Sequence, residues 1–275
     1  MTVGDALAAA GALGVARLDG QLLALHALGR RQSDRAWVLA HDDVALDAAQ
    51  QARFMGECMR RASGEPLAYI VGHKEFFGLD LHVDERVLVP RPDTETLVEW
   101  ALELLPKHTN RRVVDLGTGS GAIALAIRKH RPEIEIEAVD RSADALEVAQ
   151  GNARTLGLEV LFRQGAWLEG ATGPYDLIVS NPPYVADADP RLADLTHEPR
   201  TALAAGPDGL SDLRLIVGQA GRHLQPGGWL LLEHGHDQAA AVREMLAGAG
   251  FGWIGSRRDL AGIERCSGGQ WLELG

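Results

Sequence analysis

The four consecutive residues Asn181, Pro182, Pro183 and Tyr184 are of types and spacing that suit a defined chemistry. The Asn181 side-chain oxygen and the Pro182 backbone carbonyl are both hydrogen-bond acceptors. Prolines restrict the backbone, so these two acceptors are held at a fixed separation before a ligand binds. Tyr184 adds a flat face that can pack against a planar group. Two fixed acceptors suit the two N–H donors of an NH₂ group.

Such a clamp would hold an amide or amine nitrogen with its lone pair facing a methyl donor. An amide nitrogen is a poor nucleophile because its lone pair is delocalised into the carbonyl. In-line alignment and a desolvated pocket must therefore supply much of the acceleration. No general base is needed before transfer, since the methylated, cationic amide is a strong acid and loses its proton afterwards. We favour this interpretation over a proline-rich turn that merely ends a strand.

A second candidate site is the glycine-rich run 115–121, which follows a predicted buried strand and precedes a predicted helix. Alternating glycines allow a sharp turn and bring backbone N–H groups against a ligand at the helix N-terminus. The dinucleotide fingerprint Gly-x-Gly-x-x-Gly is met only in a degenerate form, because residue 122 is Ala. The next strand ends in Asp140, whose carboxylate can accept hydrogen bonds from both ribose hydroxyls. The candidate cofactor-binding residues are Gly117, Thr118, Gly119, Ser120, Gly121 and Asp140.

The segment from residue 91 onward alternates predicted strands and helices, which indicates an α/β fold with a mostly parallel sheet covered on both faces. Ser142 is a predicted helix cap and Gly157 the stop of the same helix. In such a sheet, ligands bind at the carboxyl ends of the strands, where Asn181 and the glycine loop both lie. Strands are predicted at residues 112–116, 134–139, 160–162, 176–180 and 229–233, and helices after Pro92 as far as Pro106, at 121–130 and at 143–156.

The last two predicted strands, near residues 253–256 and 271–274, are too close in sequence for a helical crossover. We expect them to pair antiparallel at the sheet edge. The tripeptide Gly268-Gly269-Gln270 lies just before the second of these strands and is predicted to form a glycine turn.

The first 72 residues differ in composition from the rest of the chain. They are rich in Ala, Leu and Arg, and Pro66 is their one proline. Apolar residues recur at helical spacing, which predicts a small helical bundle. Partly alternating apolar residues at 76–83 and a second run at 87–89 predict a hairpin with a charged turn between the strands. The expected organisation is a helical domain at 1–72, a hairpin linker at 73–90 and an α/β domain at 91–275.

Charge and composition narrow the function classes. Residues 1–74 contain eight basic and eight acidic side chains, so the remaining 19 basic and 30 acidic ones carry the whole net charge of −11. A duplex-binding enzyme usually presents a basic face to phosphates, so we expect no nucleic-acid partner. Cys58 and Cys266 lack metal-ligand spacing and are expected to be reduced thiols. The apolar run from Ala6 to Ala16 is interpreted as the buried face of a helix in a cytoplasmic protein without a membrane span.

The whole pattern resembles the release-factor glutamine methyltransferases, the HemK/PrmC family, over nearly the full length. The stretch Val87–Glu95 combined with Asn181–Tyr184 is the most specific part of the resemblance. Further matching stretches are Phe77-Gly78, residues 115–121, Glu198-Pro199-Arg200 and residues 259–262. The resemblance implies a seven-stranded, Rossmann-like class I methyltransferase domain preceded by a small α-helical bundle and a β-hairpin linker.

The resemblance also implies a substrate and a cofactor. The cofactor would be S-adenosylmethionine, with S-adenosylhomocysteine as product. The partners would be class-1 peptide chain release factors, docked by residues 1–72 and methylated on the glutamine of their Gly-Gly-Gln motif. By position, the loop 117–121 would hold the methionine part of the cofactor, Asp140 the ribose, and Trp167 would lie beside the adenine.

Within the same resemblance, Asn181 would contact both cofactor and substrate, and Pro182, Pro183 and Tyr184 would complete the substrate clamp. One position departs from the family, which commonly has an acid before the tryptophan where this chain has Ala166. We therefore expect a hydrogen bond to the adenine amino group to be missing.

Several alternatives remain open from the sequence. The clamp also suits the exocyclic NH₂ of adenine in DNA or RNA, which such enzymes flip into the pocket. A glutamine in a ribosomal protein is a closer rival, and a non-catalytic cofactor-binding module is a third. A metal site at residues 233–237 is disfavoured against a loop role, and self-methylation at Gln270 against a turn. The oligomeric state is open, with a monomer favoured.

Overall fold

The computed structural model describes residues 1–272, and the chain forms two compact units, Met1–His73 and Lys74–Gly275. Among the described residues, no helix has the length and apolar character needed to cross a membrane. Both cysteines are buried free thiols.

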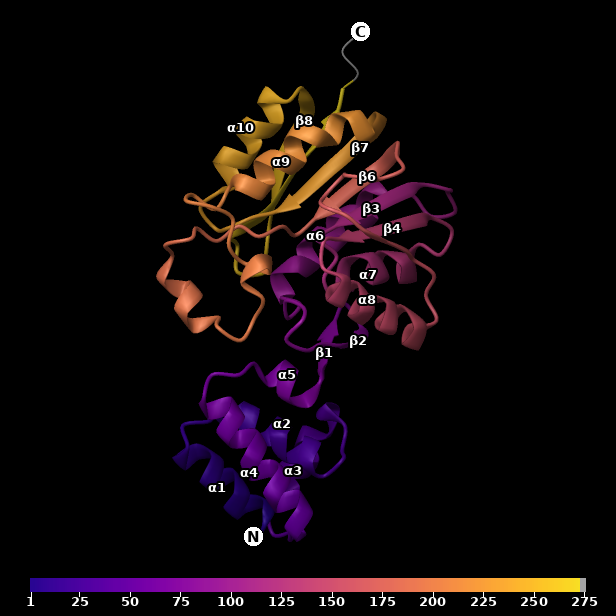
Figure 1. Cartoon of the computed structure of the whole chain (residues 1–275). Helices are drawn as coiled ribbons and strands as arrows, with labels where there is room; N and C mark the ends of the chain where they lie inside the picture. The colour runs from indigo at the N-terminus through magenta and orange to yellow at the C-terminus, as the bar shows by residue number, and fades with distance from the viewer. Residues whose placement is uncertain (273–275) are drawn as a thin grey trace. The chain divides into compact units, whose positions relative to one another are not determined.

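The first unit is a bundle of short helices around an apolar core (Figure 1). The helix at the start of the chain buries Ala6 and Ala10 but ends at Ala12, and Leu13 is exposed. The predicted buried helix face over Ala6–Ala16 is therefore confirmed only in its first part. Capping boxes begin two of the helices, one at Thr2 and one at Asp47, so the first free N–H groups of both are satisfied by side chains. The helices are α1 (Val3–Ala12), α2 (Arg17–Ala27), α3 (Arg35–Ala40), α4 (Ala48–Ala62) and α5 (Leu67–Val71), with a 3₁₀ turn η1 (Gln32–Asp34).

The second unit contains a seven-stranded sheet in the order β5-β4-β3-β6-β7-β9-β8. Strands β3 to β7 are mutually parallel, and β9 runs antiparallel to both of its neighbours. The chain moves outward on one side of β3 and then returns to its other side, which creates a switch point between β3 and β6. The strands are β3 (Arg112–Leu116), β4 (Glu135–Asp140), β5 (Leu161–Gln164), β6 (Tyr175–Ser180), β7 (Leu224–Glu233), β8 (Phe251–Arg258) and β9 (Glu264–Trp271).

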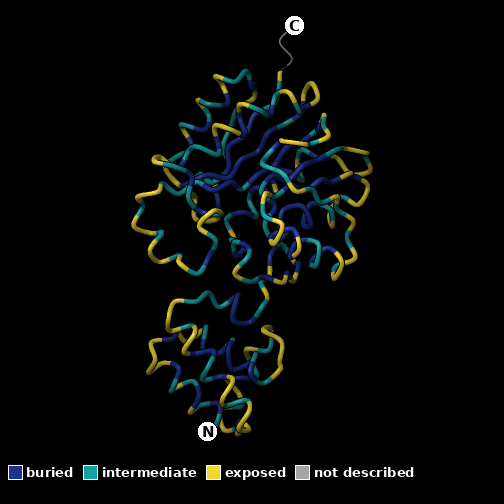
Figure 2. The backbone as a smooth tube through the Cα atoms, in the orientation of Figure 1, coloured by how far each residue is buried: buried dark blue, intermediate teal, exposed yellow. Residues whose placement is uncertain are grey.

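Helices cover both faces of this sheet, so the strands are a buried layer between more exposed helices (Figure 2). The alternation of side chains along the strands divides the core in two. Val113 and Leu177 pack with helices α6 to α8, whereas Val114 and Ile178 pack with α9 and α10. The helices are α6 (Glu95–Leu104), α7 (Ala122–His130), α8 (Ala143–Leu156), α9 (Ser211–Ala220) and α10 (Ala239–Gly248), and the 3₁₀ turns are η2 (Pro92–Thr94), η3 (Pro190–Asp194), η4 (Arg200–Ala202) and η5 (Gly221–His223).

The predicted limits of α8 are confirmed. Ser142 accepts a hydrogen bond from the Ala145 backbone N–H, and Gly157 ends the helix with a left-handed φ of 64°. The prediction that β3 spans Arg112–Leu116 is also confirmed.

The predicted strand at residues 87–89 is wrong. The hairpin consists of β1 (His73–Phe76) and β2 (Leu79–His82), so its turn comes earlier. Phe77 and Gly78 have φ angles of 48° and 74°, the positive values that close a two-residue hairpin turn. The charged residues that follow form a local turn instead, because Asp84 accepts a hydrogen bond from the Arg86 backbone N–H.

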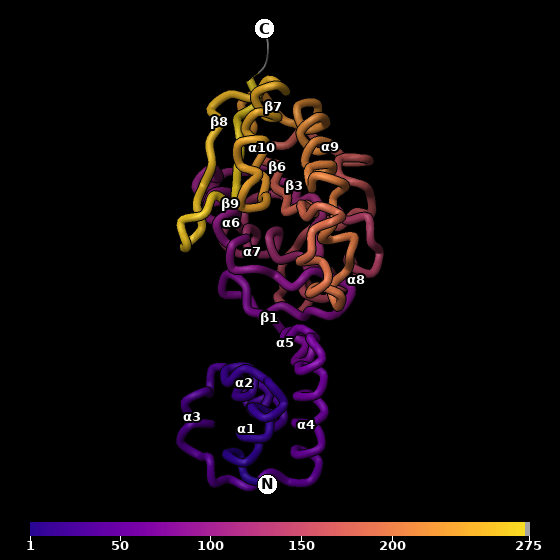
Figure 3. The backbone as a smooth tube through the Cα atoms, turned by 90° about the vertical axis from the view of Figure 1, so that its left-hand side faces the viewer, coloured from indigo at the N-terminus to yellow at the C-terminus, as the bar shows by residue number. Residues whose placement is uncertain are grey.

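The end of the chain also differs from prediction. Strand β9 ends at Trp271, so the predicted strand at 271–274 lies earlier in the chain, and residues 273–275 lie outside the described residues. The antiparallel pairing with β8 is confirmed, and β8 is the strand at the sheet edge (Figure 3). The predicted glycine turn is wrong, because Gly268 lies inside β9. A Cβ atom there would come within 2.6 Å of the Leu230 carbonyl oxygen, so this glycine permits close strand packing.

Candidate active site

A cavity of about 370 Å³ lies at the carboxyl ends of β3, β4 and β6, beside the switch point of the sheet. It brings together the two motifs that the sequence singled out. Its lining includes Gly117, Gly119, Asp140, Ala166, Trp167, Asn181 and Pro183.

The glycine loop is held against the neighbouring strand by its backbone. The N–H groups of Gly117 and Thr118 both donate to the Val139 carbonyl oxygen of β4, at 2.8 and 3.0 Å. Gly117, Gly119 and Gly121 all have positive φ, between 55° and 83°, which L side chains rarely adopt. The alternating glycines are therefore required by the backbone path of the loop.

Two of the predicted cofactor-binding side chains face the interior. The Thr118 hydroxyl donates to Asp115 Oδ2 at 2.6 Å, and Ser120 is buried with its carbonyl bonded to Asn152. Burial raises the pKa of the Asp115 carboxyl to about 7, although the hydrogen bonds from Thr118 and from the Ala124 backbone lower it. Asp115 thus binds the loop from the buried side, through Thr118 and the Ala124 backbone, while Gly117 and Gly119 line the cavity.

Asp140 joins the loop to the start of α8. Its Oδ2 accepts the Gly119 N–H and its Oδ1 accepts the Ser142 N–H, both at 2.9 Å. Each carboxylate oxygen has a further lone pair, so these bonds leave capacity for a ligand hydroxyl. Asp140 therefore lies beside the glycine loop and lines the first cavity.

Trp167 packs its ring over the glycine loop. A Cβ atom added to Gly117 would lie 3.2 Å from the ring of Trp167. Burial raises the pKa of the Asp212 carboxyl in α9, although Arg141 and the neighbouring Trp167 side chain lower it. Trp167 also has a positive φ of 53°, a conformation that persists only where surrounding contacts hold it. Asp212 was not predicted from the sequence, because it is distant in the chain and belongs to no motif.

A second cavity, of about 390 Å³, adjoins the first. Asn181 lines both, while Pro183 contributes to the first and Tyr184 to the second. Pro182 is buried. The Asn181 side chain therefore stands at the boundary of the two cavities.

Tyr184 is held at both its backbone and its side chain. Its hydroxyl donates to Glu233 Oε1 at 3.3 Å, and its carbonyl accepts from Gln238 Nε2 at 3.0 Å. Burial, together with the Glu233 carboxylate, raises the pKa of Tyr184. Burial also raises the pKa of Glu233 to about 7, although hydrogen bonds from Thr94 and Tyr184 lower it.

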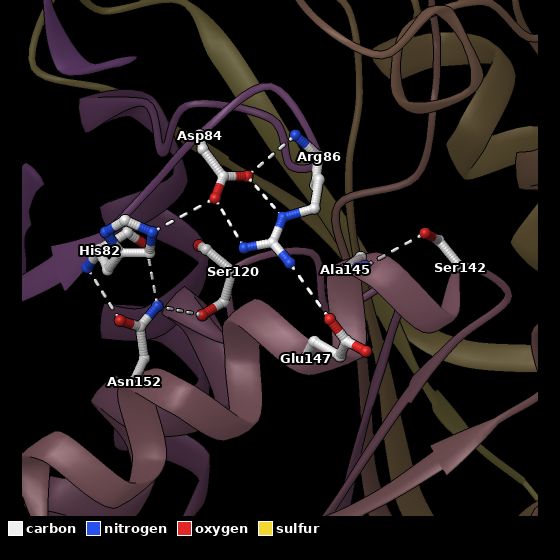
Figure 4. A network of polar contacts seen from close by, with 8 residues as sticks. All are labelled: His82, Asp84, Arg86, Ser120, Ser142, Ala145, Glu147 and Asn152. Atoms are coloured by element: carbon white, nitrogen blue, oxygen red, sulfur yellow. Dashed lines mark hydrogen bonds and ion pairs between the residues drawn. The ribbon is translucent and has the colours of Figure 1, made fainter. Parts of the chain in front are cut away.

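One wall of the first cavity is the segment 85–88, which the sequence did not assign to the site. Figure 4 shows how this wall is attached to α8. Asn152 accepts the His82 N–H at 2.8 Å and donates to the His82 carbonyl at 3.0 Å. Arg86 donates to both oxygens of Asp84 and reaches Glu147 at 3.2 Å. The hairpin and the segment after it are thus fixed against the helix that Asp140 helps to begin.

The opposite wall is the segment 199–202, from which Pro199, Thr201 and Ala202 line the first cavity. The buried Glu198 carboxylate forms an ion pair with Arg91 and accepts the Val89 N–H at 3.1 Å. Glu198 therefore connects the residues just after segment 85–88 to the segment 199–202, so the stretches 87–95 and 198–200, which the resemblance singled out, lie in contact.

His234, considered above as a metal ligand, takes part in a hydrogen-bond network within the sheet. Its ring is buried, with Nδ1 at 2.9 Å from the Gly235 carbonyl and Nε2 at 2.7 Å from the Ser267 hydroxyl. In the part of the chain that the structure describes, no three His, Cys, Asp or Glu side chains are grouped to hold a metal ion.

Comparison with known proteins places this chain in a family. Residues 3–72 match the PrmC N-terminal domain and residues 94–206 the methyltransferase small domain. A release factor glutamine methyltransferase from Xylella fastidiosa strain Temecula1 is 48% identical over 269 residues, covering 96% of this chain and 97% of that protein. A second, from Bordetella pertussis, is 50% identical, with 93% of this chain and 95% of that protein covered.

The chain belongs to the release factor glutamine methyltransferases. The family resemblance seen in the sequence motifs is confirmed by these full-length matches. A third member, from Salmonella typhimurium, is 42% identical over 259 residues, with 93% of this chain and 92% of that protein covered.

Solved structures confirm the fold class. A methyltransferase from Pyrococcus furiosus superposes with a TM-score of 0.56 at 20% identity, covering 82% of this chain and all of that one. The catalytic domain of hMettl16 in complex with MAT2A 3'UTR hairpin 6 gives a TM-score of 0.57 at 17% identity, with 82% of each chain covered. At these identities the likeness establishes the fold alone.

Proposed function

We propose that this chain transfers a methyl group from S-adenosylmethionine to the side-chain amide nitrogen of the glutamine in the Gly-Gly-Gln motif of class-1 peptide chain release factors. The observation that carries the proposal is the position of Asn181 at the boundary of two adjoining cavities. A transferase needs such a residue where donor and acceptor meet. Membership of the release factor glutamine methyltransferases supplies the substrate class.

The first cavity fits the cofactor by size and by lining. About 370 Å³ is within the usual range of roughly 300–1,000 Å³ for pockets of small molecules. Gly117 and Gly119 would leave room for the methionine part, Asp140 would accept the ribose hydroxyls, and Trp167 would adjoin the adenine. The bound cofactor supplies an electrophilic methyl group on a sulfonium.

The second cavity would take the glutamine side chain. Asn181 Oδ1 and the Pro182 carbonyl would accept its two N–H groups, which aims the nitrogen lone pair toward the first cavity. Tyr184 and Pro183 would exclude water on the two sides of Asn181. No residue needs to act as a base, because the cationic amide formed by transfer releases its proton to solvent.

The remaining parts of the chain follow from the same assignment. Residues 1–72, which match the PrmC N-terminal domain over 3–72, would dock the release factor, 73–90 would link the domains, and 91–275 would carry the chemistry. A partner in translation termination implies work in the cytoplasm. We expect neither nucleic acid nor a membrane to be required.

The proposal is tested by methyl transfer from radiolabelled S-adenosylmethionine with purified full-length protein. The acceptors are a class-1 release factor, the same factor with its Gly-Gly-Gln glutamine changed to alanine, ribosomal proteins, and double-stranded DNA. Label in the first acceptor alone is the expected result. Label in ribosomal protein or DNA, or retention of label after the glutamine is changed, would contradict the proposal.

A further inference from the structure

The side chain of Asn181 has two unlike ends, and only one of them suits the proposed clamp. Its carboxamide carries an acceptor oxygen and a donor NH₂ of nearly the same size. An incoming glutamine NH₂ needs the oxygen. With the amide turned over, two donors would face each other and neither would be satisfied. Something in the protein must therefore decide which way the Asn181 amide faces.

The first contact that decides it is with Thr94, in the 3₁₀ turn η2 just before α6. Asn181 Nδ2 donates to Thr94 Oγ1 at 3.1 Å. Thr94 is only 4% exposed, so its hydroxyl needs partners from the protein. A hydroxyl has one hydrogen to donate and can accept at its lone pairs. Whether Thr94 donates to Asn181 or accepts from it depends on where its own hydrogen goes.

The second contact fixes that hydrogen. Glu233, at the end of β7, is 1% exposed. Its Oε1 accepts from the Tyr184 hydroxyl at 3.3 Å, and its buried Oε2 has no hydrogen-bond partner among the described residues. The Thr94 hydroxyl lowers the pKa of this carboxyl, as a neighbouring donor does. An ionised carboxylate can only accept hydrogen bonds. Glu233 Oε2 is thus a buried acceptor without another partner among the described residues, and a Thr94 hydrogen turned toward it leaves Thr94 only acceptor capacity for Asn181. The Asn181 NH₂ is drawn to Thr94, and the oxygen end is left for the ligand.

We infer that Thr94 and Glu233 are positioning residues that fix the orientation of the Asn181 amide, and so present its oxygen to the substrate NH₂. The inference rests on the proposed function for the identity of that NH₂. Glu233 serves both clamp residues, because the same carboxylate also accepts from Tyr184. We call the series Glu233, Thr94 and Asn181 the relay. Thr94 comes from η2, Asn181 from the loop after β6 and Glu233 from the end of β7, so the relay exists only in the folded unit.

The test compares Thr94→Val with Thr94→Ser. Valine keeps the shape of threonine and removes the hydroxyl, whereas serine keeps the hydroxyl. We expect Thr94→Val to lower kcat on the release factor roughly 10- to 100-fold, the loss typical of one unsatisfied buried polar contact. Thr94→Ser should stay within about threefold of the wild type, and the cofactor Kd should change little in either variant. Equal loss in both variants, or wild-type kcat in Thr94→Val, would overturn the positioning role.

Thr172→Val is a matched control. The Thr172 hydroxyl also donates to a buried carboxylate, Glu137 Oε2, at 2.9 Å. This contact belongs to neither of the two cavities described above. Its loss should lower the melting temperature without lowering kcat. If Thr172→Val reduced kcat as much as Thr94→Val, the effect of Thr94 would be one of stability, and the inference would fail.

A further measurement needs no acceptor protein. In ¹⁵N-labelled enzyme, the Asn181 side-chain NH₂ should exchange slowly with solvent in the wild type and in Thr94→Ser, and faster in Thr94→Val. Unchanged exchange in Thr94→Val would overturn the inference even if methylation were observed. A wild-type protein that methylates no release factor but shows this exchange pattern would overturn the proposed function and leave the relay in place.

Discussion

On the glycine-loop side of the candidate active site, backbone atoms form most of the cavity wall. On the Asn181 side, the wall depends on a series of interacting side chains. Gly117 and Gly119 lie two residues apart, and their backbone N–H groups are bound by Val139 and Asp140 of the neighbouring strand β4. Asn181 depends instead on Thr94 and Glu233, which lie far from it in the chain. The two sides should therefore be sensitive to different changes. The loop should lose function when a side chain blocks its close packing, and the Asn181 side when a hydrogen-bond partner is removed.

Asn181→Ala should have the largest effect, because it removes the acceptor at the boundary of the cavities. We expect kcat to fall by at least about 100- to 1,000-fold, as for the loss of one preorganised catalytic hydrogen bond. The fold should persist, since Asn181 is only partly buried, and far-UV circular dichroism would check this. Near-normal turnover in a folded variant would contradict the role of the Asn181 side chain as the acceptor at the boundary of the cavities.

Gly117→Ala should damage the other side by shape. Its Cβ would lie 3.2 Å from the Trp167 ring, at a φ of +70°. We expect cofactor affinity, measured by calorimetry, to fall roughly tenfold or more through this clash and about 1 kcal/mol of backbone strain. Gly157→Ala is the matched control, with φ +64° and nothing within 4 Å of its Cβ. Equal cofactor affinity in the two variants would contradict a role for the Trp167 contact.

The pH dependence of kcat should separate the two buried carboxylates, since burial raises the pKa of both Glu233 and Asp115 to about 7. The relay needs ionised Glu233, so kcat should fall about tenfold per unit as pH drops below about 7. Asp115→Asn should keep this profile, and Glu233→Gln should flatten it. The groups acting on Glu233 are the Thr94 and Tyr184 hydroxyls, the charge of Asp93, which raises its pKa, and Arg265, which lowers it.

The stability of the fold should depend on pH in the opposite sense. Both folded pKa values lie above the unfolded ones, so these carboxyls contribute stability that is present below about pH 4 and lost as pH rises through about 7. Asp115→Asn should remove the part of the pH dependence of the unfolding free energy that comes from Asp115. That part amounts to up to about 4 kcal/mol for a shift of about three units. Urea unfolding of wild type and variant at pH 5 and pH 8 would measure it. A constant difference between the two proteins would contradict the raised pKa.

Ala166→Glu should have the smallest effect, and in the favourable direction. It restores the acid that the family commonly has before the tryptophan, at a residue that lines the first cavity. One added hydrogen bond to the adenine amino group is worth about 1 kcal/mol, or roughly fivefold in cofactor Kd. Calorimetry with S-adenosylhomocysteine would detect the gain, and kcat on the release factor should stay unchanged. Weaker binding would show that the Ala166 position does not face the adenine.

Elements with local signals were predictable from the sequence. The limits of α8 follow from Ser142 and Gly157, whose cap and left-handed stop act within a few residues. The path of the glycine loop follows from residues whose φ angles only glycine adopts readily. Errors occurred where the outcome depends on a distant partner. The run at 87–89 looks like a strand, yet it is held as a wall by Glu198.

The sequence by itself therefore determined the fold class, the family and the motif at each side of the site, because propensity, capping and glycine conformation are local properties. Only the tertiary structure decided that Gly268 belongs to a strand, since the requirement for glycine comes from the close approach of β7. Likewise, only the tertiary structure decided which end of Asn181 is presented. Glu233 sets the direction of the Thr94 hydroxyl, and Thr94 in turn sets the orientation of the Asn181 amide. These residues meet only when η2, the loop after β6 and the end of β7 pack together.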